Sequence, residues 1–419
     1  MKQRLYDNIS FAALQWFFWS GFGVVNGFLV AYMENAGYSN PQIGTVMALF
    51  ALSAILGLPF WGYITDYTRK AGRTIRFALT GGACAAIVLL LYGQHYYAAV
   101  LLAAASFSFM LEPVAPLIDT WTYHSRAVGR RVNYGVTRAM GSVGFAFTVA
   151  VTGRLLDEFG MTLMYYISVT LIVVTYLVTL SISRRVENGS QKTTIASSKK
   201  TDSALSDVAA STESTGSTRR PSVLTLFRNR EIVAFLVLTF LVFTAFRAAQ
   251  LYLPMLIIEL GGTNRHLGLA LSVQALSEVP LLILSSLLLL RYRDVTVLLW
   301  AFVFFTVRIV LHLVVWEPWG AVVVQGAQGL SFALFLPATV HFMYRVAPEG
   351  LKATAQTLAV AFSFGLGSAF GSYFGSTVLE LGDIFDVYRY GGVLSAVTVG
   401  AYYVLVYRRQ KKEVFETAE

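Results

Sequence analysis

The sequence contains a single cysteine, Cys84, among its 419 residues. One thiol cannot close a disulfide within the chain or build a cysteine-rich metal site, so both are excluded. No nucleophile–base set and no cluster of metal-ligating side chains is visible, which argues against an enzyme, a metal centre or a bound cofactor. Charged residues are also scarce, at 13%, against about 25% in soluble domains. A chain this poor in charge along most of its length is expected to have lipid as its solvent.

The sequence instead has a series of long apolar segments, each near the ~20 residues that cross a bilayer. We predict an all-α membrane protein with twelve transmembrane helices in two six-helix bundles, at residues 10–33, 40–65, 74–93, 97–122, 134–156, 161–183, 231–258, 265–290, 295–316, 318–344, 352–379 and 387–407. The bundles cover residues 1–186 and 223–419. The stretch 187–222 between them is rich in Ser, Thr and Lys and is predicted to be a flexible cytoplasmic linker.

The basic residues are distributed unevenly about these segments. Of the 32 Lys and Arg residues, those outside the predicted cytoplasmic segments are Arg138, Arg154, Arg247, Arg265, Arg308 and Arg389. This bias predicts cytoplasmic N- and C-termini for a multi-pass protein of the inner or plasma membrane. The first apolar segment has no cleavage site and is predicted to be a retained helix. The net charge of +9 then reflects topology, and no nucleic-acid partner is expected because no folded basic patch is visible.

Ionisable and polar residues inside the apolar segments are the candidates for function, because each charge costs about 2.5–3.5 kcal/mol to insert. Asp119 lies near the end of the fourth segment and Arg138 near the start of the fifth. They are interpreted either as a structural ion pair or as a clamp for a ligand inside a transport cavity. Glu112 shares a helix face with Asp119, so it lines the cavity or pairs with a base. Asn26 and Gln328 are further candidates for substrate binding.

Glu278 and Arg308 form a second predicted pair, near the middle of the eighth and ninth segments. A carboxylate removed from water tends to hold a proton, and a nearby cation displaces that proton. We therefore predict that these residues couple transport to a proton gradient, which would be the energy source in place of a cofactor. The alternative interpretation is a plain ion pair between two helices.

The loop between the second and third segments, GYITDYTRK, carries Gly62, Asp66, Arg69 and Lys70. A glycine lets a neighbouring helix approach closely, and an acid at a helix end can cap a facing helix or pair with arginine. The spacing resembles the GxxxDxxGRK signature of the major facilitator superfamily, although Arg69 follows Thr68 directly where the signature has a glycine. The resemblance implies a twelve-helix fold in which this loop acts as a conformational gate, and a degenerate copy follows the eighth segment.

Two stretches, Ala115–Asp119 and Tyr134–Phe145, look like the helix 4–5 sugar site of the lactose permease-like branch, the oligosaccharide:proton symporters. The resemblance implies that Asp119 and Arg138 hydrogen-bond sugar hydroxyls and that Phe145 stacks on the sugar ring. That branch has Glu and Trp where this chain has Asp119 and Phe145, so galactoside specificity is not implied. As an isolated residue Phe145 would be packing; its position on the helix face of Arg138 makes it a candidate.

The same resemblance extends to helices 8 and 9. Glu278 stands at the place of an acid that joins substrate recognition to proton binding, and Arg308 at the place of an arginine that aids deprotonation. The helix 10 His and Glu of that branch are replaced here by Gln328 and Ser331. Any proton would therefore be carried by Glu278, Asp119 or Glu112.

We predict a monomeric secondary active transporter that carries a sugar or oligosaccharide by proton-coupled symport and alternating access. Its partners would be a small-molecule substrate, protons and the lipid bilayer. Two alternatives remain open: uptake or efflux of another small solute, such as a drug, a nucleoside or an aromatic acid, and a membrane sensor that transports nothing.

Overall fold

The computed structural model describes residues 2–68, 70–127, 132–197, 224–349 and 351–410. These residues form helices joined by short turns, with no strand among them. The N-terminal half contains α1 (Lys2–Asn35), α2 (Asn40–Thr68), α3 (Ala71–Tyr92), α4 (Tyr97–Leu111), α5 (Val114–Ala127), α6 (Tyr134–Phe159) and α7 (Leu163–Ser197). The C-terminal half contains α8 (Leu224–Arg228), α9 (Arg230–Leu251), α10 (Leu253–Glu259), α11 (Asn264–Arg291), α12 (Asp294–Leu311), α13 (Pro318–Gln325), α14 (Gln328–Val346), α15 (Lys352–Val360), α16 (Ser368–Leu381) and α17 (Ile384–Tyr402). A 3-10 turn (His312–Val314) and two π-helical segments (Ala361–Gly367 and Tyr403–Tyr407) continue helices of the second half.

The helices build two bundles of membrane spans. Eleven spans are long and apolar enough to cross a membrane, and α11, a further helix of 28 residues, lies where the sequence predicts the eighth. Helices are the form expected here, because a helix in lipid satisfies its backbone hydrogen bonds internally. Buried apolar side chains run through both halves as one core. The predicted fold class, an all-α membrane protein of two six-helix bundles, is confirmed.

The fourth span of each half is broken. In the first half α4 ends at Leu111 and α5 begins at Val114, and in the second half α13 ends at Gln325 and α14 begins at Gln328. Interrupted helices at corresponding positions of two repeats commonly mark the binding site of a transporter. Irregular backbone at membrane depth is tolerated where it is buried in protein or lines a water-filled cavity. The two breaks therefore point to the region between the bundles.

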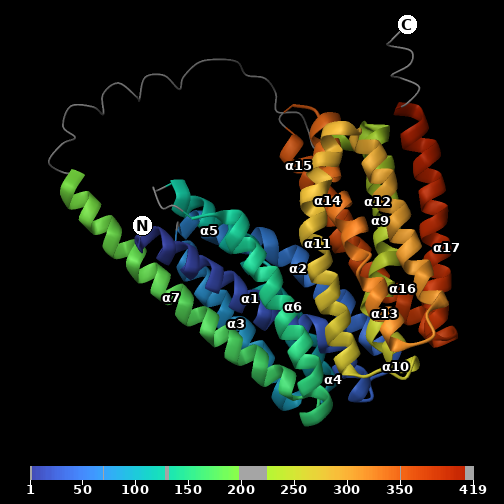
Figure 1. Ribbon diagram of the computed structural model, residues 1–419, viewed down its shortest axis with the longest axis horizontal. Helices are drawn as coiled ribbons and strands as arrows, with labels where there is room; N and C mark the ends of the chain where they lie inside the picture. Colours follow the sequence, from blue (N-terminus) through green and yellow to red (C-terminus); the bar gives the residue numbers. More distant parts are fainter. Residues whose placement is uncertain (1, 69, 128–131, 198–223, 350, 411–419) are drawn as a thin grey trace, which may run out of the picture.

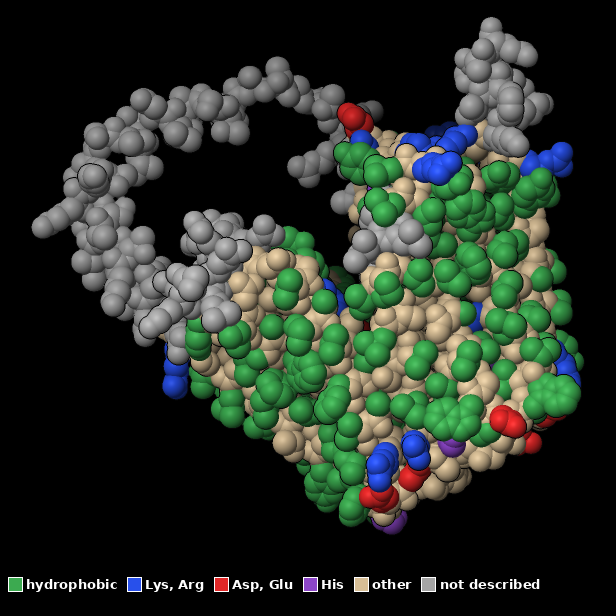
Figure 2. All heavy atoms as spheres, viewed as in Figure 1, with side chains coloured by type: hydrophobic (Ala, Val, Ile, Leu, Met, Phe, Trp, Pro, Cys, Tyr) green, Lys and Arg blue, Asp and Glu red, His purple; other side chains and the backbone are tan. Residues whose placement is uncertain are grey.

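The two bundles converge at one end and diverge at the other, toward the end that carries the chain termini (Figure 1). At the converging end α6 packs against α11 and α2 packs against α16. A Cβ added at Gly153 of α6 would lie 2.2 Å from the carbonyl oxygen of Asn264, and one at Gly268 of α11 would lie 2.3 Å from that of Val149. Figure 2 shows the molecule hollowed between the halves at the opposite end. The open side is therefore the one that the charge bias predicts to be cytoplasmic.

The helix that leads into the predicted linker is longer than expected. α7 continues to Ser197, so the first part of the stretch 187–222 is helical rather than flexible. The remainder of the predicted linker, residues 198–222, lies outside the described residues.

The predicted gating loop stands apart from the other bundle. Gly62 was expected to let a neighbouring helix approach, but a Cβ added there would meet nothing within 4 Å. That expectation is wrong for this conformation, because the bundles are separated at this end. Asp66 and Lys70 are exposed, and Arg69 lies outside the described residues.

Candidate functional site

In the N-terminal bundle, α1 inserts two side chains between the predicted acid and base. Asp119 Oδ1 accepts a hydrogen bond from Gln15 Nε2 at 2.8 Å, and Gln15 Oε1 accepts one from Trp19 Nε1 at 3.0 Å. The guanidinium of Arg138 lies over the Trp19 ring, with Cζ 4.6 Å from the ring centroid. Asp119 and Arg138, both described, form no direct ion pair within 4.0 Å. The interpretation as a plain ion pair is therefore wrong.

Two other predicted binding residues lie where α1 meets α6 and α11. Phe145 of α6 is half-buried, and a Cβ added at Gly23 would come within 2.3 Å of its Cδ2 atom, so its ring lies directly on α1. Asn26 of α1 is exposed. It precedes Gly27, whose added Cβ would lie 2.7 Å from Leu271 Cδ1 of α11. Asn26 is thus close to the boundary between the bundles, whereas Phe145 packs on α1 of its own bundle. For both residues, contact with a substrate stays a prediction.

Arg308 of α12 is the centre of a polar cluster in the C-terminal bundle and is only 3% exposed. Its Nη2 donates to Gln250 Oε1 at 2.6 Å, and its guanidinium also donates to the side-chain oxygens of Gln325 and Gln328. Gln328 Nε2 in turn donates to Glu278 Oε1 at 3.2 Å. An amide therefore joins Glu278 to Arg308, and the alternative interpretation, a plain ion pair between two helices, is wrong here too.

The position of Gln328 corrects one site prediction. Its side chain is 2% exposed and lies behind Glu278, so it supports the acid instead of facing a solute. The cluster closes at the back through His312, whose Nε2 lies 3.1 Å from Gln325 Nε2 and whose Nδ1 lies 2.8 Å from the Arg308 carbonyl oxygen. The amides and the imidazole behind the acid are thus bound to one another, as burial in an apolar bundle requires, while Arg308 Nε is buried without a partner.

Opposite charges of the two bundles interact electrostatically across their boundary. Arg138 of α6 interacts electrostatically with Glu278 of α11, and Glu112, at the α4–α5 break, with Arg247 of α9. Arg247 Nε also donates to a serine hydroxyl of α16 at 2.8 Å. Each bundle therefore supplies one acid and one base to the boundary. Of the two interpretations of Glu112, the structure favours an interaction with a base. That base, Arg247, belongs to the opposite bundle.

Sequence reasoning missed four polar residues of this region: Gln15, Trp19, Gln250 and Gln274. Gln250 Nε2 donates to Gln274 Oε1 at 2.9 Å, while the other two link Asp119 to Arg138 as described above. Each lies inside an apolar span, where any polar side chain must find a partner. A polar side chain within an apolar span is visible in the sequence, but an uncharged amide or indole is a weaker indication of function than a charged group.

Comparison with known proteins assigns the family. A sequence model of the MFS_1 like family matches residues 8–390. The chain belongs to this family. A maltose permease from Geobacillus stearothermophilus is 28% identical over 380 residues, which cover 90% of this chain and 89% of that protein. The uncharacterized transporter YwbF from Bacillus subtilis (strain 168) is 24% identical over 397 residues, which cover 93% and 92%.

Solved structures share the fold. The nucleoside transporter NupG superimposes with a TM-score of 0.76 at 18% identity, over 97% of this chain and 99% of that one. The peptide transporter POT, in complex with sulfate, gives a TM-score of 0.71 at 12% identity, over 98% and 94%. At such identities the likeness concerns the fold alone. The predicted resemblance to the major facilitator superfamily is confirmed, and this chain is one of its transporters.

At the closed end of this transporter, an acid of one bundle caps a helix of the other. Asp157 of α6 accepts from the backbone N–H of Asn264 at 2.9 Å, from its Nδ2 at 3.0 Å and from the backbone N–H of Arg265 at 3.1 Å. The first N–H groups of a helix have no partner within it, so a carboxylate there satisfies them and meets the positive end of the helix dipole. This contact helps to hold α6 and α11 together at that end.

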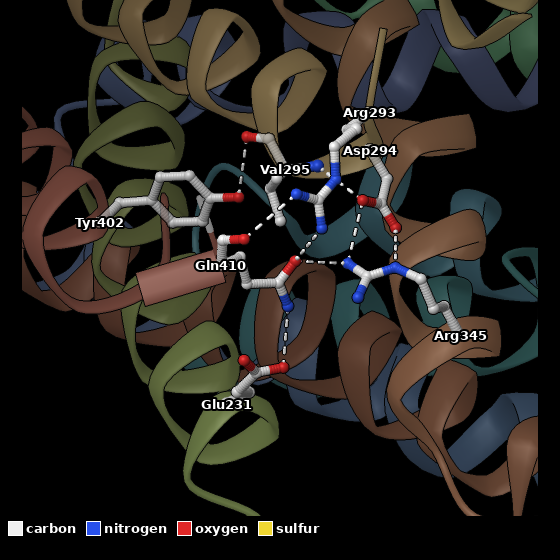
Figure 3. Close-up of polar contacts among 7 residues, drawn as sticks. All are labelled: Glu231, Arg293, Asp294, Val295, Arg345, Tyr402 and Gln410. Carbon is white, nitrogen blue, oxygen red and sulfur yellow. Dashed lines mark hydrogen bonds and ion pairs between the residues drawn. The ribbon is translucent and has the colours of Figure 1, made fainter. Parts of the chain in front are cut away.

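A second polar cluster ties together helix ends at the open side of the C-terminal bundle (Figure 3). Gln410 Oε1 accepts from Arg345 Nη2 at 2.9 Å and from Arg293 Nη2 at 3.3 Å, while its Nε2 donates to Glu231 Oε2 at 2.8 Å. Arg345 also makes a bidentate pair with Asp294, with both contacts at 2.9 Å. These contacts link the ends of α9, α12, α14 and the last span, which favours movement of the bundle as one body.

Proposed function

We propose that this transporter carries a neutral sugar or oligosaccharide by proton-coupled symport and alternating access. The observation that supports the proposal is the arrangement of polar side chains from both bundles along their boundary, with Asp119 and Arg138 on one side and Gln274 and Glu278 on the other. Carboxylates, amides and guanidinium groups make directional hydrogen bonds, which suit the hydroxyl groups of a sugar. The 28% identity to a maltose permease supports a sugar as the substrate class.

The balance of charge in the region favours a neutral solute. The acids are Glu112, Asp119 and Glu278, and the bases are Arg138, Arg247 and Arg308. Because these opposite charges compensate one another, a charged solute would leave a charge unpaired in a medium of low dielectric constant, which is costly. A nucleoside is also neutral and carries hydroxyls, so the experiment must distinguish nucleoside transport from sugar transport.

Glu278 is the proposed proton carrier. Its carboxylate accepts a hydrogen bond from Gln328 and interacts electrostatically with Arg138 of the other bundle. A proton on Glu278 would neutralise it and weaken its attraction to Arg138. Gain and loss of the proton would then change the contact between the bundles, which is the requirement for coupling a proton to alternating access.

The conformation described here would be the one that releases substrate on the side of the termini. The next step of the cycle would separate α6 from α11 at the closed end and bring the bundles together at the open end. Asp157 and the gating loop with Asp66 lie at these two ends, so each would make or break contacts during the cycle.

The experiment is uptake of radiolabelled maltose into proteoliposomes that contain the purified full-length protein. An imposed gradient, acid outside, is expected to accelerate uptake, and a protonophore should abolish the acceleration. Glu278→Gln should retain maltose exchange but lose its response to the gradient, because the carrier of the proton is gone. Arg154→Ala, which breaks only an exposed pair at 3.3 Å within α6, is the matched control and should behave as the wild type.

The substrate clamp has its own test in the same assay. Asp119→Asn and Arg138→Ala are expected to abolish maltose uptake, and uptake that persists in both would contradict the clamp. Transport of uridine without maltose would establish the nucleoside alternative. Sugar binding without any flux would establish a sensor.

A further inference from the structure

Arg308 fixes the direction of the amides around it. A guanidinium carries only donors, so the oxygens of Gln250, Gln325 and Gln328 must face it, as they do. Their amide nitrogens therefore point away from Arg308 and donate outward. One of them meets His312 at the back of the cluster, which leaves two that lead elsewhere.

The two remaining amides lead to neighbouring positions on α11. Gln250 Nε2 donates to Gln274 Oε1 at 2.9 Å, and Gln328 Nε2 donates to Glu278 Oε1 at 3.2 Å. Gln274 and Glu278 are one helical turn apart, so their side chains lie side by side. Because the Gln274 oxygen is engaged, its Nε2 group keeps two N–H donors for a ligand. Glu278 keeps its second oxygen as an acceptor.

This face of α11 is turned toward the N-terminal bundle. Leu271, the contact of Gly27 on α1, lies one turn before Gln274, and Glu278, which interacts with Arg138 of α6, lies one turn after it. Gln274 is half-buried. Its Nε2 atom bonds to no other described residue and is not among the buried atoms that lack a partner, so solvent reaches it. The free donors of Gln274 are therefore open to the boundary between the bundles.

We infer that Gln274 is a substrate-binding residue and that Arg308 is the residue that positions it. Gln274 Nε2 donates to one hydroxyl of a sugar ring while the Glu278 carboxylate accepts from another. Arg308 holds both groups in place through Gln250 and Gln328 and does not touch the substrate. The inference rests on the proposed function and narrows the substrate to a solute with two hydroxyls along one edge, as in a pyranose ring.

The test measures binding of maltose and of its monodeoxy analogues to the purified full-length protein by titration calorimetry. Gln274→Leu is expected to weaken maltose binding about tenfold, the effect of losing one hydrogen bond to a neutral hydroxyl. One monodeoxy analogue, which lacks the hydroxyl that Gln274 meets, should bind the variant and the wild type equally. Gln42→Leu, the same change at the start of α2, is the matched control and should bind maltose as the wild type does.

A second variant tests the positioning role. Arg308→Lys keeps the charge, but an ammonium cannot hold three amide oxygens in the planar arrangement of a guanidinium. We expect maltose binding about tenfold weaker than in the wild type. Adding Gln274→Leu to Arg308→Lys should then cost less than about twofold more, because the two residues act through one chain of hydrogen bonds. A merely structural role for Arg308 would make the two effects multiply.

The outcomes separate this inference from the function on which it rests. If the wild type binds maltose and Gln274→Leu binds it equally well, Gln274 is not a binding residue, and the proposed function stands. The same conclusion follows if each deoxy analogue, compared with maltose, loses affinity by the same factor in the variant as in the wild type. If the losses of maltose affinity in Arg308→Lys and Gln274→Leu multiply in the double variant, Arg308 does not position Gln274. A wild-type protein that binds no sugar would overturn the proposed function and this inference together.

Discussion

Asp157 of α6 accepts a hydrogen bond from the backbone N–H of Asn264, the first residue of α11, at 2.9 Å. The two residues belong to different bundles, so this helix cap exists only while the bundles touch at the closed end. A carboxylate cap contributes about 1 kcal/mol to a helix. Here the same energy biases the equilibrium toward the described conformation and away from the one that is open at the opposite end, because separation of α6 from α11 breaks the contact.

Asp157→Ala is therefore expected to shift the equilibrium about fivefold away from the described conformation, as a loss of about 1 kcal/mol requires. The measurement is the distance between spin labels at Tyr67 and Leu290, two exposed positions at the ends of α2 and α11, in a background that carries Cys84→Ser. A larger population of short distances shows that the open end has closed. Glu158→Ala is the control, because Glu158 pairs only with Arg154 of its own helix, and its distance distribution should match the wild type.

Gly153→Ala is expected to slow maltose uptake at least fivefold. The added Cβ would lie 2.2 Å from the Asn264 carbonyl oxygen, a backbone atom, so α6 and α11 must move apart, and overpacking of this kind costs about 1–3 kcal/mol. Gly400→Ala provides the comparison, since a Cβ there meets nothing within 4 Å and should leave uptake unchanged. Equal rates for the two variants would show that close α6–α11 packing is not required for transport.

Trp19→Phe is expected to weaken maltose binding about fivefold, near the effect of losing one hydrogen bond. The change keeps an aromatic ring beneath Arg138 but removes the N–H that donates to Gln15 at 3.0 Å. Gln15 would then be free to turn, and its bond to Asp119 would loosen. Trp16→Phe, on the same helix, is the matched control, and titration calorimetry on both proteins decides. Equal losses in the two variants would mean that ring size matters and the N–H does not.

Gln410→Leu is expected to lower the melting temperature in detergent by about 4 °C, because hydrogen bonds to charged groups contribute about 1.5–3 kcal/mol. The leucine would leave Glu231 without the amide that donates to it, and it would remove one acceptor each from Arg293 and Arg345. Arg345 would keep its pair with Asp294, and Arg293 would keep its bond to the backbone carbonyl of residue 410. Arg389→Ala serves for comparison, since it removes only an exposed ion pair, worth about 0–1 kcal/mol. A melting temperature that moves equally little in both variants would show that the cluster in Figure 3 does not hold the helix ends together.

The membrane spans could be predicted because each depends on a continuous stretch of chain. An apolar run of sufficient length forms a helix in lipid whatever surrounds it, since its backbone has no other way to satisfy its hydrogen bonds. The break between Leu111 and Val114 was also foreseeable, because prolines interrupt the helix there. The extension of α7 to Ser197 was not, since its composition is that of a loop.

The partners of the polar residues could not be predicted in this way. A direct ion pair was one interpretation of Asp119 and Arg138, yet Gln15 and Trp19, a hundred or more positions away in the chain, lie between them. Which face of α1 turns toward α5 and α6 depends on the packing of the whole bundle, and no local pattern encodes it.

The sequence by itself determined that this chain spans a membrane, how many times it crosses, and which charged residues within the spans are candidates for a functional role. Only the tertiary structure decided that the amide of Gln328 donates to Glu278 and that the amide of Gln250 donates to Gln274. The physical reason is the distance in the chain over which each property is set. The free energy of inserting a segment into lipid is a sum over neighbouring residues, whereas the orientation of an amide is set by donors from other helices.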